Sequence, residues 1–160
     1  MKLNDTLEHF LNKQNYVVVS TLDKKGTIHT SLKGVVEIEP DGKIIILDLY
    51  KARTYENISN NPNVTLTAAD DRSFKGFSLS GKAKIIKKSD ISKKKIDIWH
   101  ERLAKRIARR VITHVKEARA ESESIPEAKF PLPQYLIEIT VERIVDLAPK
   151  KVITKQNSGG

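Results

Sequence analysis

Cysteine is absent from this chain of 160 residues, and tryptophan and methionine occur once each. Without cysteine, neither disulfide bonds nor thiolate metal sites can form. The four histidines contain no His-x-x-x-His pair, so no metal site is expected. Apolar runs of about 18 residues, which a membrane span needs, are also missing, and the first seven residues lack the apolar centre of a signal peptide. We therefore expect a cytoplasmic protein that does not enter membranes.

The length predicts a single domain, which we place at residues 1–150, followed by a flexible C-terminal tail at residues 151–160. Short apolar or alternating runs, separated by turn residues, predict most of that domain to be β-structure. The expected strands are residues 16–21, 27–38, 44–49, 64–68, 76–86 and 135–141. Gly76 and Gly81 suggest bends or bulges, which closing a sheet requires. We expect a closed antiparallel barrel of about six strands, because closure removes exposed strand edges.

Helical spacing of apolar residues appears in two further segments. Residues 3–14 predict an N-terminal amphipathic helix that Asn4 or Asp5 caps, and a helix of about 25 residues should begin near residues 89–92. The long helix has an apolar stripe that we expect to be buried, made of Trp99, Leu103, Ile107, Val111 and Val115. Residues 93–119 hold ten basic and three acidic side chains. This basic face is either solvated or attracts an anion such as an acidic substrate, a deazaflavin or nucleic acid.

A tight corner between the third strand and a short helix at residues 54–60 is the most informative local feature. The first amides of a helix lack intrahelical partners, and the helix dipole favours negative charge there. Lys51 and Arg53 flank this start, and Thr54 adds a hydroxyl. A guanidinium presents paired donors that match phosphate oxygens. The corner is therefore either a phosphate site or an ordinary surface helix with two solvated cations.

The order of these elements resembles the pyridoxamine 5'-phosphate oxidase-like superfamily of FMN-binding split β-barrels. The resemblance covers residues 17–84 and a closing strand at 136–147. The matching motifs are the strand 44–48, Lys51 with Arg53-Thr54, the Asn-Asn-Pro-x-Val-Thr-Leu run at 60–66, and the segment 76–83. It implies a Greek-key split barrel that binds FMN at a homodimer interface and works as an oxidoreductase or electron carrier with a small-molecule substrate or electron donor.

The resemblance also implies site residues. Arg53 and Thr54 match the pair that grips the FMN phosphate, and Lys51 assists them. The flavin and ribityl chain would lie along Ser31, Leu32 and Lys33, with Leu47 and Asp48 at the end of the next strand. Gly76 and Phe77 would approach the flavin of the partner subunit.

Three positions depart from the oxidases themselves, which usually carry Arg at the position of Ser31, often Lys at that of Thr54, and a neutral hydroxyl at that of Asp48. The Asp48 carboxylate would repel a phosphate unless Lys51 or Arg53 compensates it. The oxidases' C-terminal substrate segment also has no counterpart after Tyr135. We therefore expect a smaller FMN-binding relative. Two alternatives remain: a non-catalytic protein whose basic face binds polyanions such as nucleic acid, and a haem protein on the same barrel.

Overall fold

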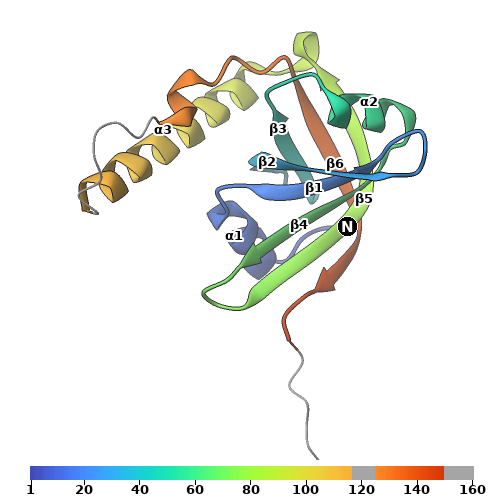
Figure 1. The fold of residues 1–160 in the computed structure, drawn as a ribbon, viewed down its shortest axis with the longest axis horizontal. Coiled ribbons are helices and arrows are strands. Elements are labelled where there is room, and N and C mark those ends of the chain that lie inside the picture. Colours follow the sequence, from blue (N-terminus) through green and yellow to red (C-terminus); the bar gives the residue numbers. More distant parts are fainter. Residues whose placement is uncertain (117–124, 150–160) are drawn as a thin grey trace, which may run out of the picture.

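The computed structural model describes residues 1–116 and 125–149, so the tail at 151–160 lies outside the described residues. Six antiparallel strands close into a barrel in the order β1-β2-β3-β6-β5-β4 (Figure 1). The strands are β1 (Val17–Leu22), β2 (Ile28–Ile38), β3 (Lys43–Asp48), β4 (Asn63–Asp70), β5 (Lys75–Lys87) and β6 (Tyr135–Asp146). The predicted fold class, a closed antiparallel barrel of mainly β-structure, is confirmed.

The barrel bends where the strand register shifts, between Val35 and Glu37 in β2 and between Ser80 and Gly81 in β5. At Gly81 the backbone of β6 approaches so closely that any side chain would collide with the carbonyl of Thr140. This is the bulge that the sequence suggested at Gly81. Gly76, the second glycine expected at a bend, instead pairs regularly with Ala69.

Two helices lie at opposite ends of the barrel (Figure 1). Helix α1 (Asp5–Lys13) is capped by Asn4, whose Oδ1 accepts a hydrogen bond from the amide of Leu7 at 2.8 Å. Its Leu7 and Leu11 side chains enter the core of the barrel. Helix α2 (Arg53–Asn60) covers the other end, where Ile58 is buried. The barrel interior is thus sealed at both ends, with α2 following directly from β3.

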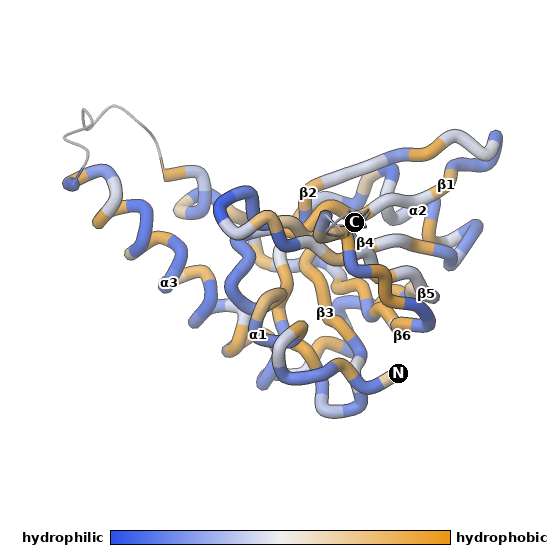
Figure 2. Tube along the Cα trace, turned by 90° about the horizontal axis from the view of Figure 1, so that it is seen from below, coloured by the Kyte–Doolittle hydropathy of each residue, from blue (hydrophilic) through white to orange (hydrophobic). Residues whose placement is uncertain are grey.

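Helix α3 (Lys93–Lys116) packs on the outside of the barrel between two short 3-10 helices, η1 (Lys88–Asp90) and η2 (Pro126–Lys129). Trp99 and Leu103 contact a second apolar cluster on the outer face of β2, β3 and β6. The rest of the helix projects away from the barrel (Figure 2). Val111 is therefore 43% exposed and Val115 76% exposed. The expectation that the whole apolar stripe is buried is wrong for these two residues, because the helix is longer than the barrel surface beneath it.

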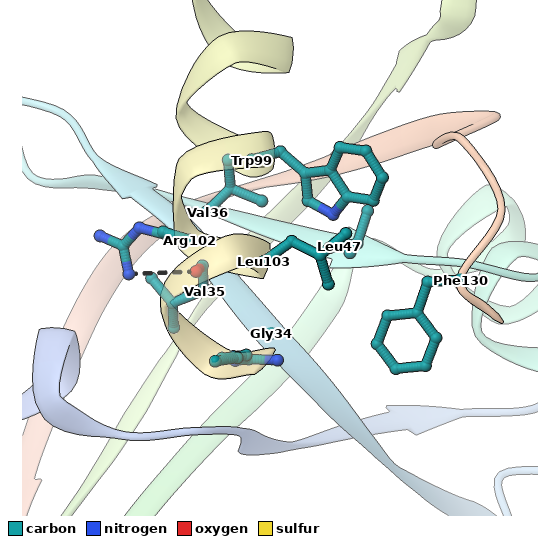
Figure 3. Close-up of a pocket in the computed structure, with 9 residues that line it drawn as sticks. Gly34, Val35, Val36, Leu47, Trp99, Arg102, Leu103 and Phe130 are labelled. Carbon is teal, nitrogen blue, oxygen red and sulfur yellow. Dashed lines mark hydrogen bonds between the residues drawn. The ribbon is translucent and has the colours of Figure 1, made fainter. Parts of the chain in front are cut away.

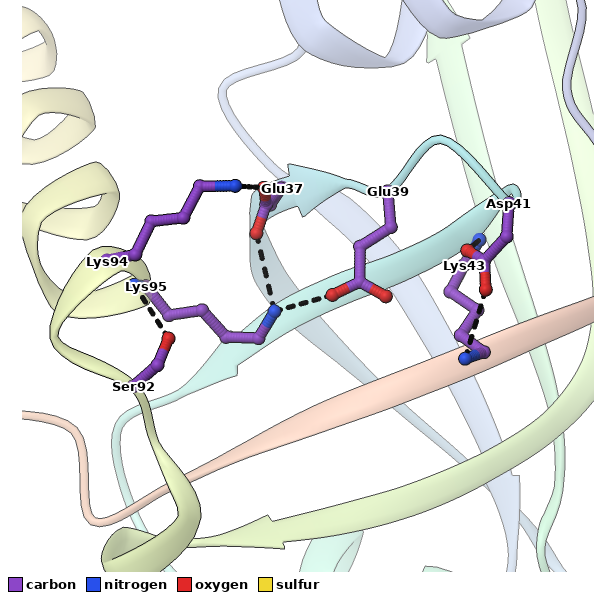
Figure 4. Close-up of polar contacts among 7 residues, drawn as sticks. All are labelled: Glu37, Glu39, Asp41, Lys43, Ser92, Lys94 and Lys95. Atoms are coloured by element: carbon purple, nitrogen blue, oxygen red, sulfur yellow. Dashed lines mark hydrogen bonds and ion pairs between the residues drawn. The ribbon is translucent and has the colours of Figure 1, made fainter.

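Acidic residues of β2 and of the turn after it fix the start of α3 (Figure 4). Lys95 Nζ lies 2.5 Å from Glu39 Oε1 and 3.4 Å from Glu37 Oε2, and Ser92 Oγ accepts a hydrogen bond from the Lys95 amide. Burial alone would lower the pKa of Lys95, but the bonds to Glu39 and Glu37 raise it.

Within residues 1–116 and 125–149, no helix combines the length and hydrophobicity that crossing a bilayer requires.

Candidate functional site

The corner between β3 and α2 has the features of an anion site. The N-cap residue, Ala52, supplies no side-chain bond, so the first amides of α2 keep their donor capacity. Arg53 and Lys51 are exposed beside them, and Lys51 Nζ lies 4.4 Å from the centre of the Tyr55 ring. Two exposed cations therefore lie beside uncapped amides at the positive end of a helix.

Hydroxyl and amide side chains attach α2 to the end of the barrel. Thr54 Oγ1 lies 3.1 Å from Ser31 Oγ of β2, and Asn57 Nδ2 donates to Thr21 Oγ1 of β1 at 3.0 Å. Thr54, Asn57 and Thr21 are buried. The structure thus brings together Ser31 and Thr54, two of the predicted site residues, but it turns the Thr54 hydroxyl inward. Thr54 positions the start of α2, and the exposed cations of the corner are Lys51 and Arg53.

An ion pair lies beside these contacts, inside the end of the barrel. Lys33 Nζ is 2.5 Å from Asp48 Oδ1, and the two side chains are only 11% and 4% exposed. Tyr135 at the start of β6 donates to the other oxygen of Asp48. Burial, and then the hydrogen bond to Asp48, raise the pKa of Tyr135 well above its usual range. Lys33, rather than Lys51 or Arg53, is therefore the residue that compensates the Asp48 charge.

Tyr135 is the member of this group that sequence reasoning missed. It stacks edge-to-face on Tyr55 of α2, with ring centres 4.9 Å apart, and pairs with Asp48 across β3 and β6. The contact between Tyr135 and Asp48 forms because β6 pairs with β3, and the local sequence does not show which strands pair. The only local signal was a tyrosine at the first position of a predicted strand.

Two predicted site residues have side chains outside the barrel. Leu32 is 62% exposed on the outer face of β2. Leu47 packs against Trp99 under α3, where Phe130 and Arg102 also line a cavity of about 20 Å³ (Figure 3). Such a cavity holds one water molecule at most. Leu47 can therefore contribute backbone to a cofactor site at the corner, while its side chain belongs to the α3 contact.

Gly76 and Phe77 lie at the end of the barrel that α1 covers. Phe77 stacks edge-to-face on Phe10 with ring centres 5.1 Å apart, and Gly76 is buried beside Leu147. Within one protomer the structure does not bring them to the α2 corner. Their expected role toward the flavin of a partner subunit stays a prediction.

A patch on the outer face of β1, β4, the first half of β2 and the first half of β5 is uncharged, although 31% of all residues are charged and Lys82 and Lys84 follow on β5. Its outward positions are Val18, Ser20, Leu22, Ile28, Thr30, Leu32, Thr65, Thr67, Ser78 and Ser80. A groove of about 310 Å³ runs over it, with Asn63 and Glu142 at its edge. Depletion of charge in a patch that exposes Ile28 and Leu32 is typical of the centre of a protein interface.

Comparisons with known proteins agree with this architecture. A family model described as pyridoxamine 5'-phosphate oxidase matches residues 3–147. HupZ from Group A Streptococcus is 20% identical with a TM-score of 0.62, over 91% of this chain and 94% of that chain.

Two further solved structures share the fold. A putative pyridoxamine 5'-phosphate oxidase from Lactobacillus delbrueckii is 21% identical with a TM-score of 0.57, covering 90% of this chain and 93% of that one. HutZ, the heme storage protein from Vibrio cholerae, is 16% identical with a TM-score of 0.53, covering 91% and 94%. Among curated proteins, no sequence matches significantly. At these identities the solved structures show a shared fold and no particular ligand.

Proposed function

The chain belongs to the pyridoxamine 5'-phosphate oxidase family, and on this basis we propose that it binds FMN at the corner between β3 and α2. The observation that carries the proposal is the start of α2, where free amides lie beside the exposed cations Arg53 and Lys51. A doubly charged phosphate ester matches these donors. The Asp48 carboxylate at the end of β3 is neutralised from inside the barrel by Lys33 and does not oppose the phosphate.

We further propose that the flavin lies between two copies of the chain. Leu32 and the hydroxyl-rich patch on the outer face of β1, β4 and the first half of β5 offer an uncharged surface to a second copy. A twofold dimer needs one self-complementary patch, and a patch without charge avoids repulsion between identical groups. A flavin extending from the α2 corner along β2 would be shielded from water by such a partner.

Bound FMN would supply the redox chemistry, so the protein would act as an oxidoreductase or electron carrier. The residues of this chain would hold the phosphate, orient the ring along β2 and exclude water. Ser31 and Thr54 fix α2 against β2 and thereby set the distance between the phosphate donors and the ring-binding strand. No side chain is required as a nucleophile in this role.

The proposal is tested by titrating the purified protein with FMN and following the quenching of flavin fluorescence. We expect one FMN to bind per chain. Light scattering should give the mass of two chains. Anaerobic addition of NADH and NADPH then tells whether a nicotinamide reduces the flavin. A protein that takes up hemin with a strong Soret band and no FMN would be a haem protein instead, like the heme storage protein HutZ.

A further inference from the structure

A second cationic feature lies far from the α2 corner, between α3 and the connection from α1 to β1. It is a groove of about 370 Å³ lined by Asn12, Asn15, Arg102, Lys105, Arg106 and Arg109. The four basic residues recur at a spacing of three or four along α3, so their side chains lie on one face of the helix. The groove belongs to the side of the helix that faces the body of the protein.

Neutral groups hold the two innermost guanidinium groups in place. Arg102 donates to the carbonyl of Val35 at 3.2 Å and to Asn12 Oδ1 at 2.6 Å, and Arg106 donates to the carbonyl of Asn15. Burial lowers the pKa of Arg102 and of Arg106, and the more distant carboxylates of Glu37 and Glu101 at Arg102, and of Glu127 at Arg106, offset this only in part. In the part of the chain that the structure describes, no carboxylate forms an ion pair with either residue.

Three other cations that are at least half buried have acidic partners. Lys33 pairs with Asp48, Lys95 with Glu39, and Arg110 with Glu127. The groove differs because its lining contains one carboxylate, Glu101, and this group is paired with Lys105 at 2.6 Å. Positive charge that carboxylates offset only from a distance is costly in a concave, partly desolvated place, and a bound anion would relieve that cost.

We propose that this groove binds a small molecule carrying two or more phosphate or carboxylate groups. Arg102, Arg106 and Arg109 span about 10 Å along the helix, which a single anionic group cannot bridge. Neutral acceptors occupy only part of each guanidinium fork and leave further N–H groups for the ligand. Beyond Arg106 and Arg109 the lining changes to Arg110, His114 and the buried carboxylate Glu127, whose second oxygen would repel a longer polyanion. The shape therefore favours a compact oligoanion over a nucleic acid.

Calorimetric titration of the full chain with inorganic tripolyphosphate at low salt tests the proposal. Arg109→Gln should weaken binding about fivefold, because Arg109 is exposed and removing its charge leaves the fold intact. Glu101→Gln should strengthen binding, since it removes the carboxylate from the lining. Arg72→Gln, at an exposed arginine in the turn between β4 and β5, is the matched control and should leave the affinity unchanged.

Equal affinities for the wild type, Arg109→Gln and Glu101→Gln would overturn the proposal, as would loss of binding in Arg72→Gln. Binding of duplex DNA without binding of tripolyphosphate would also overturn it and would favour the nucleic-acid alternative. Titration with citrate separates the two kinds of ligand, since tighter binding of citrate than of tripolyphosphate assigns a polycarboxylate. Backbone amide shifts at Asn15 and Arg106 on addition of the anion would place it in the groove.

Discussion

Ser31 Oγ and Thr54 Oγ1 lie 3.1 Å apart, although 23 residues separate them in the sequence. This bond joins the middle of β2 to the first turn of α2. The free amides of α2 therefore have a fixed position relative to the strand on which the flavin would lie. A cofactor held by both elements would gain affinity from this preorganisation, since the protein has little ordering left to do on binding.

Thr54→Val tests this link with a side chain of nearly the same shape. The partly buried Ser31 hydroxyl loses its partner, so we expect a loss of about 1 kcal/mol in the free energy of unfolding, measured with urea. FMN affinity should fall as well, because the start of α2 loosens. In a double-mutant cycle with Ser31→Ala the two stability losses should be less than additive, and strictly additive losses would show that the bond does not couple the helix to the strand.

Arg53→Ala removes the guanidinium at the start of α2. We expect FMN to bind at least about tenfold more weakly, because a charge-assisted phosphate contact is lost. Fluorescence titration measures the affinity, and urea unfolding should show little change because Arg53 is exposed. Arg109→Ala is the control, an exposed arginine on another helix, and should bind FMN normally. If both variants bind FMN as the wild type does, the phosphate lies elsewhere.

Much of this architecture follows from local sequence signals. The alternation in β4 and β5 reflects strands with one face toward the core and one toward solvent. Helix α2 ends at Asn60 because Pro62 prevents further helix two residues later, and Ser92 caps α3 as expected. Each of these features depends on residues that are close in the sequence, which is why the sequence alone predicted them.

The contacts that the sequence could not predict join distant segments. Asp48 and Tyr135 are 87 residues apart, and their bond depends on which strand closes the barrel beside β3. The pairing of Asp48 with Lys33 depends on the register of β2 and β3. Val115 has the same helical spacing as the buried Trp99, yet it is exposed because the barrel surface ends before the helix does. The spacing of apolar residues predicts which face of a helix is apolar. Only the tertiary structure decides how much of that face is buried.

Lys33→Met leaves the Asp48 carboxylate buried without its cation. We expect a loss of about 3–5 kcal/mol, measured by urea unfolding, because an uncompensated buried charge is costly. The double variant Lys33→Met/Asp48→Asn removes both charges, and its Asn oxygen can still accept the Tyr135 hydrogen bond. It should recover much of the lost stability. A double variant as unstable as Lys33→Met would mean that lost packing, and not the stranded charge, causes the effect.

Tyr135→Phe should change the dependence of stability on pH. The folded-state pKa of Tyr135 is raised by burial and by Asp48, whereas an unfolded tyrosine ionises near 10.0. The unfolded state therefore releases this proton first, so the contribution of Tyr135 is complete below pH 10.0 and is lost as the pH rises above it. Urea unfolding from about pH 8 to 11 should show a steeper decline for the wild type than for Tyr135→Phe.

At neutral pH, Tyr135→Phe should cost about 1–3 kcal/mol, since Asp48 loses a buried donor. The other alkaline titrations, including that of Lys95, whose pKa is also raised, are common to both proteins and cancel in the comparison. Parallel pH curves for the two proteins would show that Tyr135 ionises as easily in the folded protein as in the unfolded chain.

Thr65→Glu tests the uncharged face as the contact between two copies. Thr65 lies in the groove of that face, 3.1 Å from Ser80, and pairs with Ser20 of β1. A twofold contact would bury the new carboxylate without a partner, so we expect the mass in light scattering to fall from two chains to one. Thr140→Glu is the control, an exposed strand residue that pairs with Lys43 and Lys82, and it should leave the mass unchanged.

The same variant connects assembly to the cofactor. If FMN lies between two copies, Thr65→Glu should weaken FMN binding without touching Arg53 or Lys51, and the affinity of the wild type should rise with protein concentration through mass action. If the variant is monomeric and still binds FMN as tightly as the wild type, the flavin site lies within one chain. If it remains a dimer, the two copies meet through another surface, and the low charge of this face then requires a different explanation.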